Sequence, residues 1–172
     1  MSCTAVKRVL IVASCSIAFG WTSLVIGASI ESEASAVARL YKDFAWQAMA
    51  SQAELFGEDV THQSKANLGK YFTPALADLL ARDAACQIAS GGICNLEVDL
   101  LFDSQDPRVT DLEITRTAPG KVTVSFKDPV ADRTTRIDFL VVRTAGRWRI
   151  ADMVYHDPGE LSLKQLLSRK LR

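Results

Sequence analysis

Residues 86–106 read CQIASGGICNLEVDLLFDSQD, and this stretch separates a helical first half of the chain from a strand-rich second half. Its two cysteines, Cys86 and Cys94, enclose seven residues, of which two are glycine. An isolated cysteine pair with a flexible connector indicates a disulfide when the chain is exported. A metal or redox site is the alternative, but the spacing is not Cys-x-x-Cys and no further ligands accompany the pair. We therefore expect a disulfide, with no metal and no cofactor.

The residues after Cys94 alternate between apolar and charged types. Leu96, Val98, Leu100 and Phe102 occupy one set of positions, and Glu97, Asp99 and Asp103 occupy the other. Such alternation predicts a strand with one apolar face. Acidic side chains along one strand are spread over roughly 20 Å, whereas a cation site needs several oxygens at one point. We expect the acidic face to be solvated.

Before the cysteine pair, the apolar spacing predicts helices. Residues 33–50 have one apolar face, and Ser32 or Ser35 can cap their start. A polar loop over 51–64 follows, with a lone histidine, His62, that has no ligand partners at metal-binding spacing and should lie at the surface. A short helical turn is expected within 65–71.

The next helix has clear end signals. Thr73 is placed to cap it, Pro74 suits its first position, and Gly91-Gly92 should end it after Ala89. Tyr71 and Phe72 precede it, either as a pocket wall or as core aromatics at a helix junction.

The second half predicts a meander of antiparallel strands. Expected strands cover 107–117, 121–127, 135–143 and 148–154, joined by turns at Pro119-Gly120, Asp128-Pro129 and Ala145-Gly146. A closing helix over 161–167 should follow Asp157-Pro158-Gly159. The fold class is therefore α+β, with N-terminal helices packed on an antiparallel sheet.

Asp152 breaks the pattern of the last strand, because it is predicted on the same face as Trp148, Ile150 and Val154. A carboxylate buried there could have a raised pKa and act as a general base, with Tyr155 or Tyr71 as proton donor. The alternatives are a β-bulge, or a carboxylate that is satisfied by backbone N–H groups or an arginine.

Residues 1–29 have the composition of an export signal. Lys7 and Arg8 are followed by an uncharged run from Val9 to Ile26 and then by small residues. The run could instead remain as a membrane anchor, since it has 18 residues. Val12-Ala13-Ser14-Cys15 also resembles a lipobox, which would make Cys15 a lipid attachment site. Each reading places residues 30–172, as one domain, outside the cytoplasm, in the periplasm of a bacterium.

The charge of the chain argues against nucleic acid as a partner. Without the first 30 residues the chain has 18 basic and 20 acidic residues, a net charge of −2. Nucleic-acid binding needs a concentrated basic surface, and the only basic run in the sequence is the short tail 164–172.

Four motifs, in this order, resemble the DUF3828 family of exported bacterial proteins, which belongs to the NTF2-like superfamily. They are Tyr71-Phe72-Thr73-Pro74-x-Leu, Asp103-Ser-Gln105-Asp106, Trp148-Arg-Ile-Ala-Asp152 and Leu161-x-Leu163-x-x-Leu166-Leu167, within residues 37–167. The resemblance implies an NTF2-like (cystatin-like) cone, a curved sheet wrapped over helices. It implies no reaction, because that fold hosts enzymes, binders and partner proteins alike.

We expect a periplasmic, non-catalytic binding protein of the cell envelope, with an unknown protein partner or small ligand. An immunity protein or an envelope accessory protein is a special case. Tyr71, Gln105, Asp106 and Trp148 are the candidate binding residues. The alternative is an isomerase or dehydratase-type enzyme with Asp152 as general base, which predicts Asp152 in an apolar cavity with no partner except a ligand. Membrane contact is expected only through the N-terminal segment, if it is retained or lipidated.

Overall fold

The computed structural model describes residues 31–49, 53–156 and 159–171, so the expected signal segment and Cys15 lie outside the described residues. The described chain is α+β, with helices followed by a five-stranded antiparallel sheet. Within the described residues, no helix is long and apolar enough to span a membrane.

Helices dominate the first half, as predicted, but a short helix over 53–56 lies within the stretch 51–64 that was expected to be a loop. They are α1 (Glu33–Phe44), the 3-10 helix η1 (Ala45–Ala48), α2 (Ala53–Phe56), α3 (Lys65–Leu68) and α4 (Pro74–Ser90). Ser32 and Ser35 both cap α1, because each side chain accepts a hydrogen bond from the backbone N–H of the other. Thr73 caps α4, Pro74 occupies its first turn, and Gly91 ends it with φ of 67°.

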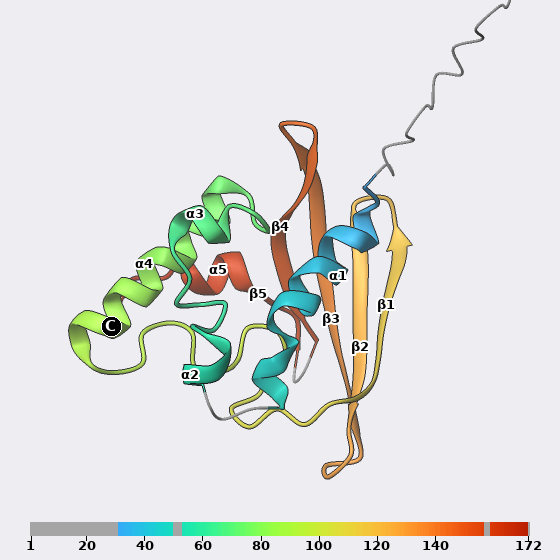
Figure 1. Ribbon diagram of the computed structural model, residues 1–172, viewed down its shortest axis with the longest axis horizontal. Helices are drawn as coiled ribbons and strands as arrows, with labels where there is room; N and C mark the ends of the chain where they lie inside the picture. The colour runs from blue at the N-terminus through green and yellow to red at the C-terminus, as the bar shows by residue number, and fades with distance from the viewer. Residues whose placement is uncertain (1–30, 50–52, 157–158, 172) are drawn as a thin grey trace, which may run out of the picture.

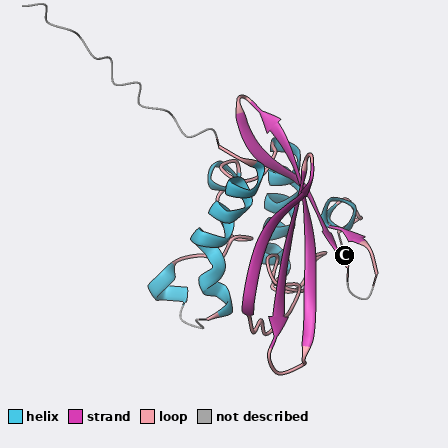
Figure 2. Cartoon of the chain, turned by 90° about the vertical axis from the view of Figure 1, so that its right-hand side faces the viewer, coloured by secondary structure: helices cyan, strands magenta, loops and turns pink. Residues whose placement is uncertain are grey.

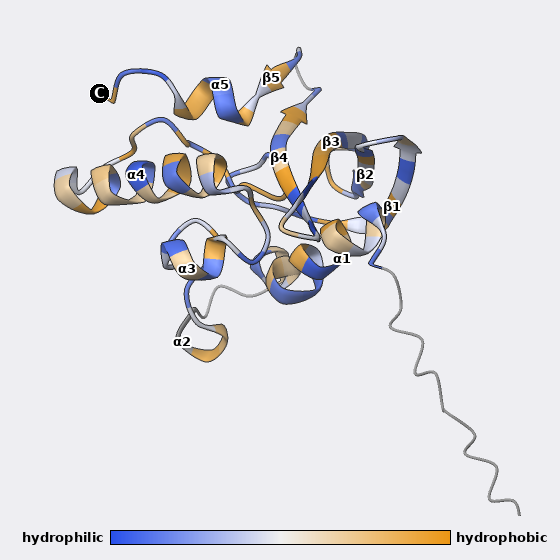
Figure 3. Cartoon of the chain, turned by 90° about the horizontal axis from the view of Figure 1, so that it is seen from above, coloured by the Kyte–Doolittle hydropathy of each residue, from blue (hydrophilic) through white to orange (hydrophobic). Residues whose placement is uncertain are grey.

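The sheet contains β1 (Thr110–Ala118), β2 (Lys121–Asp128), β3 (Arg133–Thr144), β4 (Arg147–Tyr155) and β5 (Leu161–Ser162), in sequence order. The closing helix α5 (Leu163–Leu167) begins at its cap Ser162. Helix α1 lies across one face of the sheet, and α5 lies beyond the β5 edge (Figures 1 and 3). Figure 2 shows the sheet edge-on beside the helical layer.

The core lies between α1, α4 and the inner face of the sheet. Its fully buried large side chains are Leu40, Leu68, Phe72, Leu76, Leu80, Leu100, Leu101, Phe102, Ile137, Phe139, Ile150 and Met153. Alternate residues of β3, Ile137, Phe139 and Val141, point into it, as the period of two predicted.

The predicted strand over residues 96–103 is wrong, because this stretch is an irregular loop. The Asp99 carboxylate accepts hydrogen bonds from the backbone N–H groups of Leu101 and Phe102, at 2.7 and 3.1 Å, and so turns the chain. Two buried tyrosine hydroxyls then anchor the loop: Tyr41 donates to Leu101 O at 2.8 Å and Tyr155 to Leu100 O at 2.9 Å. The acidic residues do not share one face, since Asp99 is half-buried and Glu97 is exposed.

The predicted disulfide between Cys86 and Cys94 is confirmed, with a Cα–Cα distance of 6.2 Å. It ties the last turn of α4 to the loop that follows. Asp83, buried on α4, supports the same junction by accepting hydrogen bonds from the backbone N–H groups of Asn95 (2.9 Å) and Leu96 (3.3 Å).

A β-bulge changes the direction of the side chains in the second half of β4. Leu140 pairs with Asp152 and Val141 pairs with Ile150, which leaves Ala151 as an extra residue. Ile150 before the bulge and Met153 after it therefore both face the core. Asp152 lies on the opposite face, so its predicted position beside Ile150 is wrong.

Candidate functional site

Asp152 does not have the surroundings expected of a general base. Its carboxylate accepts hydrogen bonds from the backbone N–H groups of Met153 and Lys164, both at 2.9 Å, and from the Ser162 hydroxyl at 2.6 Å. The predicted apolar cavity around an unpartnered Asp152 is therefore wrong. The carboxylate instead fastens the start of α5 to β4. This agrees with the alternatives to a general base, namely a β-bulge and a carboxylate satisfied by backbone N–H groups.

The tyrosines proposed as proton donors are also engaged. Tyr155 is buried, its hydroxyl donates to the Leu100 carbonyl, and burial raises the pKa of Tyr155. Tyr71 donates to the Asp43 carboxylate at 2.6 Å; burial and that hydrogen bond raise the pKa of Tyr71 to about 12. Tyr71 also packs edge-on against Phe44, so it is a core aromatic.

The other candidate residues divide between two regions. Gln105 and Asp106 are exposed, with long hydrogen bonds to the Glu97 carbonyl (3.5 Å) and to Arg108 (3.4 Å) respectively. Trp148 is half-buried on β4, and its indole N–H donates to the Glu31 carbonyl at 2.9 Å. Tyr71 follows Lys70 in the sequence and Trp148 lies between Arg147 and Arg149, and these three basic residues line a pocket.

That pocket has a volume of about 300 Å³ and is lined by Glu31, Arg39, Lys70, Arg147 and Arg149. We call it the basic pocket, because it has four cationic side chains and one carboxylate. None of the four cations was identified from the sequence. Arg147 and Arg149 are two residues apart on one strand, a spacing that places both side chains on the same side, and this was the available signal.

Three parts of the chain meet at the basic pocket. The segment Gly69–Thr73 runs along the edge of β4, where Ile150 N–H donates to Tyr71 O at 2.8 Å and Thr73 N–H donates to Ile150 O at 2.9 Å. This pairing holds Lys70 beside the two arginines. Helix α1 contributes Arg39, and Glu31 lies one residue before the N-cap Ser32 of that helix.

Two of the pocket's cations have partners. Arg39 forms an ion pair with Glu31 and a long hydrogen bond, 3.4 Å, to the Lys70 carbonyl. Arg149 donates to the Gly69 carbonyl at 2.9 Å and to the Trp148 carbonyl at 3.0 Å. These contacts fix the guanidinium groups at the wall of the pocket.

The other two cations, Lys70 and Arg147, are exposed, and their side chains have no hydrogen bond or ion pair with any described residue. Burial, followed by the positive charges of Arg39 and Arg147, lowers the pKa of Arg149. Burial raises the pKa of Glu31, but the hydrogen bond and charge of Arg39 outweigh it, and the net direction is downward. The pocket therefore keeps its carboxylate ionised and still has an excess of positive charge.

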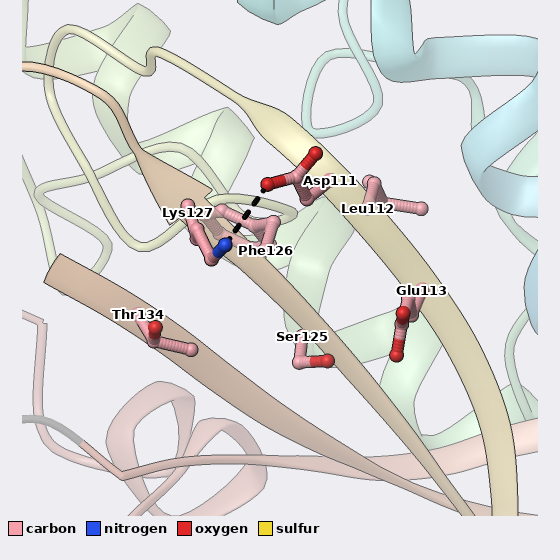
Figure 4. A pocket seen from close by; sticks show the side chains of 7 residues that line it. All are labelled: Asp111, Leu112, Glu113, Ser125, Phe126, Lys127 and Thr134. Atoms are coloured by element: carbon pink, nitrogen blue, oxygen red, sulfur yellow. Dashed lines mark ion pairs between the residues drawn. The ribbon is translucent and has the colours of Figure 1, made fainter. Parts of the chain in front are cut away.

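A second depression, of about 430 Å³, lies over β1, β2 and β3 (Figure 4). Its lining residues are Asp111, Leu112, Glu113, Ser125, Phe126, Lys127 and Thr134. Figure 4 shows its one cation, Lys127, paired with Asp111 at 3.1 Å. With that pair satisfied, this depression has no unpaired cation to attract an anionic ligand.

Each of the two histidines contacts a carboxylate. His62 contacts Asp59 at 2.7 Å, and His156 contacts Asp138 at 2.9 Å through Nε2. Among the described residues there is no group of three or more His, Cys, Asp or Glu side chains that could hold a metal ion. His156 belongs to a cluster of interacting charges on the outer face of the sheet, whose centre is Asp138.

Comparisons with known protein families, with curated proteins and with solved structures found no match to this chain.

Proposed function

We propose that this protein is an exported, non-catalytic binding protein of the cell envelope that binds an anionic ligand in the basic pocket. One observation carries the proposal: four cationic side chains converge on the pocket against one carboxylate, and two of the four have no partner among the described residues. The whole chain beyond residue 30 has more acidic than basic residues, 20 against 18. The positive charge of the pocket is therefore local and does not reflect the net charge of the chain.

The pocket has the groups that an oxyanion needs. Arginine offers several N–H donors in one plane, and lysine offers a flexible ammonium group. An anion in the pocket would neutralise like charges that otherwise repel one another. Phosphate, carboxylate and sulfate esters share this chemistry, and the volume of about 300 Å³ suits a small group of this kind.

We propose that the α+β fold is an NTF2-like cone and that the chain is a member of the DUF3828 family. The order of elements, with helices first and a curved antiparallel sheet afterwards, supports the cone. The family assignment depends on the four ordered motifs.

Calorimetric titration with inorganic phosphate and pyrophosphate tests the binding proposal. The wild-type protein should bind pyrophosphate, and the double variant Lys70→Gln/Arg147→Gln should bind it at least tenfold more weakly, because two charge-assisted contacts are lost.

The matched control is Arg169→Gln/Lys170→Gln. It removes the same charge from exposed positions near the C-terminus and should bind like the wild type. Equal binding by all three proteins, or no binding by the wild type, would sink the proposal.

A further inference from the structure

The basic pocket lies at the end of the molecule where residues 1–30 join the described chain. Glu31, the first described residue, lines the pocket. Helix α1 begins at the same end as the β1–β2 and β3–β4 hairpins (Figure 1). The preceding 30 residues contain the uncharged run Val9–Ile26, and their only charges are the basic residues Lys7 and Arg8.

The positive charge extends past the pocket to the β3–β4 hairpin. The Arg143 guanidinium lies over the Trp148 ring, 5.9 Å from its centroid, and is exposed. Arg143 and Arg147 flank the turn Thr144–Gly146, so both ends of this hairpin tip are cationic. An indole beside several cations is a combination typical of protein surfaces that meet lipid headgroups.

The length of the intervening chain limits the distance between this end and a membrane. From Ile26 to Glu31 there are five Cα–Cα steps, which reach at most about 18 Å at 3.3–3.6 Å per residue. If the segment Val9–Ile26 is retained in a bilayer, the basic pocket cannot lie far from the lipid surface. An anion attached to that surface is then the ligand at the highest local concentration.

We propose that the basic pocket binds the phosphate of an anionic membrane lipid and so holds the α1 end of the domain against the membrane surface. This inference rests on the proposed function, since it names the source of the anion. Lys70 and Arg147 contact the headgroup phosphate, Arg39 and Arg149 line the wall behind them, and Arg143 contacts neighbouring headgroups. Glu31 keeps Arg39 oriented.

A lipid surface fits the arrangement better than a small free anion does. Lys70, Arg143 and Arg147 are all exposed, so the cations form an open surface rather than an enclosed cage. A free anion would leave Arg143 unused, whereas a membrane presents many anions side by side. Near an anionic surface each basic side chain strengthens binding about fivefold.

Hydrogen exchange of the protein as recovered from the envelope tests the inference, in nanodiscs of phosphatidylcholine with and without phosphatidylglycerol. The readout does not depend on whether residues 1–30 are retained. Anionic lipid should slow the exchange of backbone amides in Gly69–Tyr71 and Arg143–Trp148. The hairpin Asp128–Arg133, at the opposite end of the sheet (Figure 1), serves as the internal control and should not change.

Loss of two cations corresponds to about a 30-fold weaker local binding constant. In Lys70→Gln/Arg147→Gln the protection should therefore fall to the level seen in neutral lipid. The control Arg169→Gln/Lys170→Gln should keep it. Protection that is equal in neutral and anionic lipid, or that survives in the pocket variant, would overturn the inference.

The phosphate titration separates this inference from the proposed function. If pyrophosphate binds to the wild type but anionic lipid gives no protection, the pocket takes a soluble anion and only the lipid assignment fails. If neither binds, both fail. Equal loss of protection in the pocket variant and in the control variant would mean that net charge alone attracts the protein, which also overturns the lipid site.

Discussion

Two groups of charges lie on the sheet, and they differ in how completely the charges are satisfied. At the Asp138 cluster, one carboxylate with 2 % exposure contacts Lys121 (2.6 Å), Arg136 (3.3 Å) and His156 (2.9 Å), and accepts a hydrogen bond from Thr123 at 2.7 Å. At the basic pocket, one carboxylate faces four cations, and two of those have no partner within residues 31–49, 53–156 and 159–171.

The difference separates a structural arrangement of charges from the binding site that we propose. In the Asp138 cluster, every cation points at a buried acceptor, so little attraction for an outside anion remains. In the basic pocket one carboxylate cannot pair with four cationic side chains. An anion from outside the protein would pair with the cations that remain. The same residue types therefore stabilise the fold in one place and remain available to a ligand in the other.

The largest expected effect comes from removing the acceptor of the Asp138 cluster. Asp138→Asn leaves three basic side chains facing one another, and breaking a buried ion pair costs about 3–5 kcal/mol. Lys121 and Arg136 are partly exposed, with side-chain exposures of 35 % and 53 %, so water compensates in part. We expect the free energy of unfolding in urea to fall by about 3 kcal/mol.

The exposed Asp106 provides the control, since Asp106→Asn makes the same chemical change and should cost less than about 0.5 kcal/mol. Equal stabilities of the two variants would show that the Asp138 cluster is not structural.

Lowering the pH should show the contribution of the Asp138 cluster to stability without a mutation. Burial raises the pKa of Asp138, but its hydrogen bonds to Lys121, Thr123, Arg136 and His156 outweigh burial and hold that pKa well below its usual range. A depressed pKa in the folded state contributes stability that is present above the unfolded value, about 4, and is lost as the pH falls toward the folded value.

Urea unfolding measured from pH 5 down to about pH 2 should therefore show a steeper loss of stability for the wild type than for Asp138→Asn. Asp99, whose pKa burial raises, acts in the opposite direction and is present in both proteins. Parallel pH profiles would contradict the assignment.

Local signals predicted most of the fold. Thr73-Pro74 and Gly91 set the ends of α4, and the turns Pro119-Gly120 and Ala145-Gly146 separate the strands. Gly120 and Gly146 have φ of 75° and 78°, a conformation that glycine adopts without strain. These signals lie within a few residues of the structure they determine.

The errors arose where distant residues decide the structure. The alternation over 96–103 resembled a strand, but the hydroxyls of Tyr41 and Tyr155 hold that loop from distant parts of the chain. The bulge at Ala151 depends on pairing with β3 and moves Asp152 to the other face. The basic pocket combines α1, the Gly69–Thr73 segment and β4, and no local pattern in the sequence joins these.

Asp152 differs from the carboxylates of the Asp138 cluster and of the basic pocket, because it accepts hydrogen bonds from backbone N–H groups. In Asp152→Asn, one carboxylate oxygen is replaced by an NH₂ group that cannot accept the hydrogen bond from Ser162. We expect a loss of about 1 kcal/mol in the free energy of unfolding, with faster hydrogen exchange in α5.

Ser162→Ala removes the same hydrogen bond from the other side, so the double variant should cost less than the sum of the two single variants. Unchanged stability with altered pyrophosphate binding would instead place Asp152 at the ligand.

The smallest expected effect has the opposite sign and lies at the basic pocket. Arg147→Gln removes a charge that repels Arg149 and has no partner among the described residues. Without a ligand, we expect the free energy of unfolding to rise by about 0.3 kcal/mol, the size of a surface like-charge repulsion. Pyrophosphate should reverse the order, because a ligand stabilises only the protein that binds it. Urea unfolding with and without pyrophosphate measures both, and Arg169→Gln should change neither. A destabilised Arg147→Gln in the absence of ligand would mean that the basic pocket, like the Asp138 cluster, is held together by its own charges.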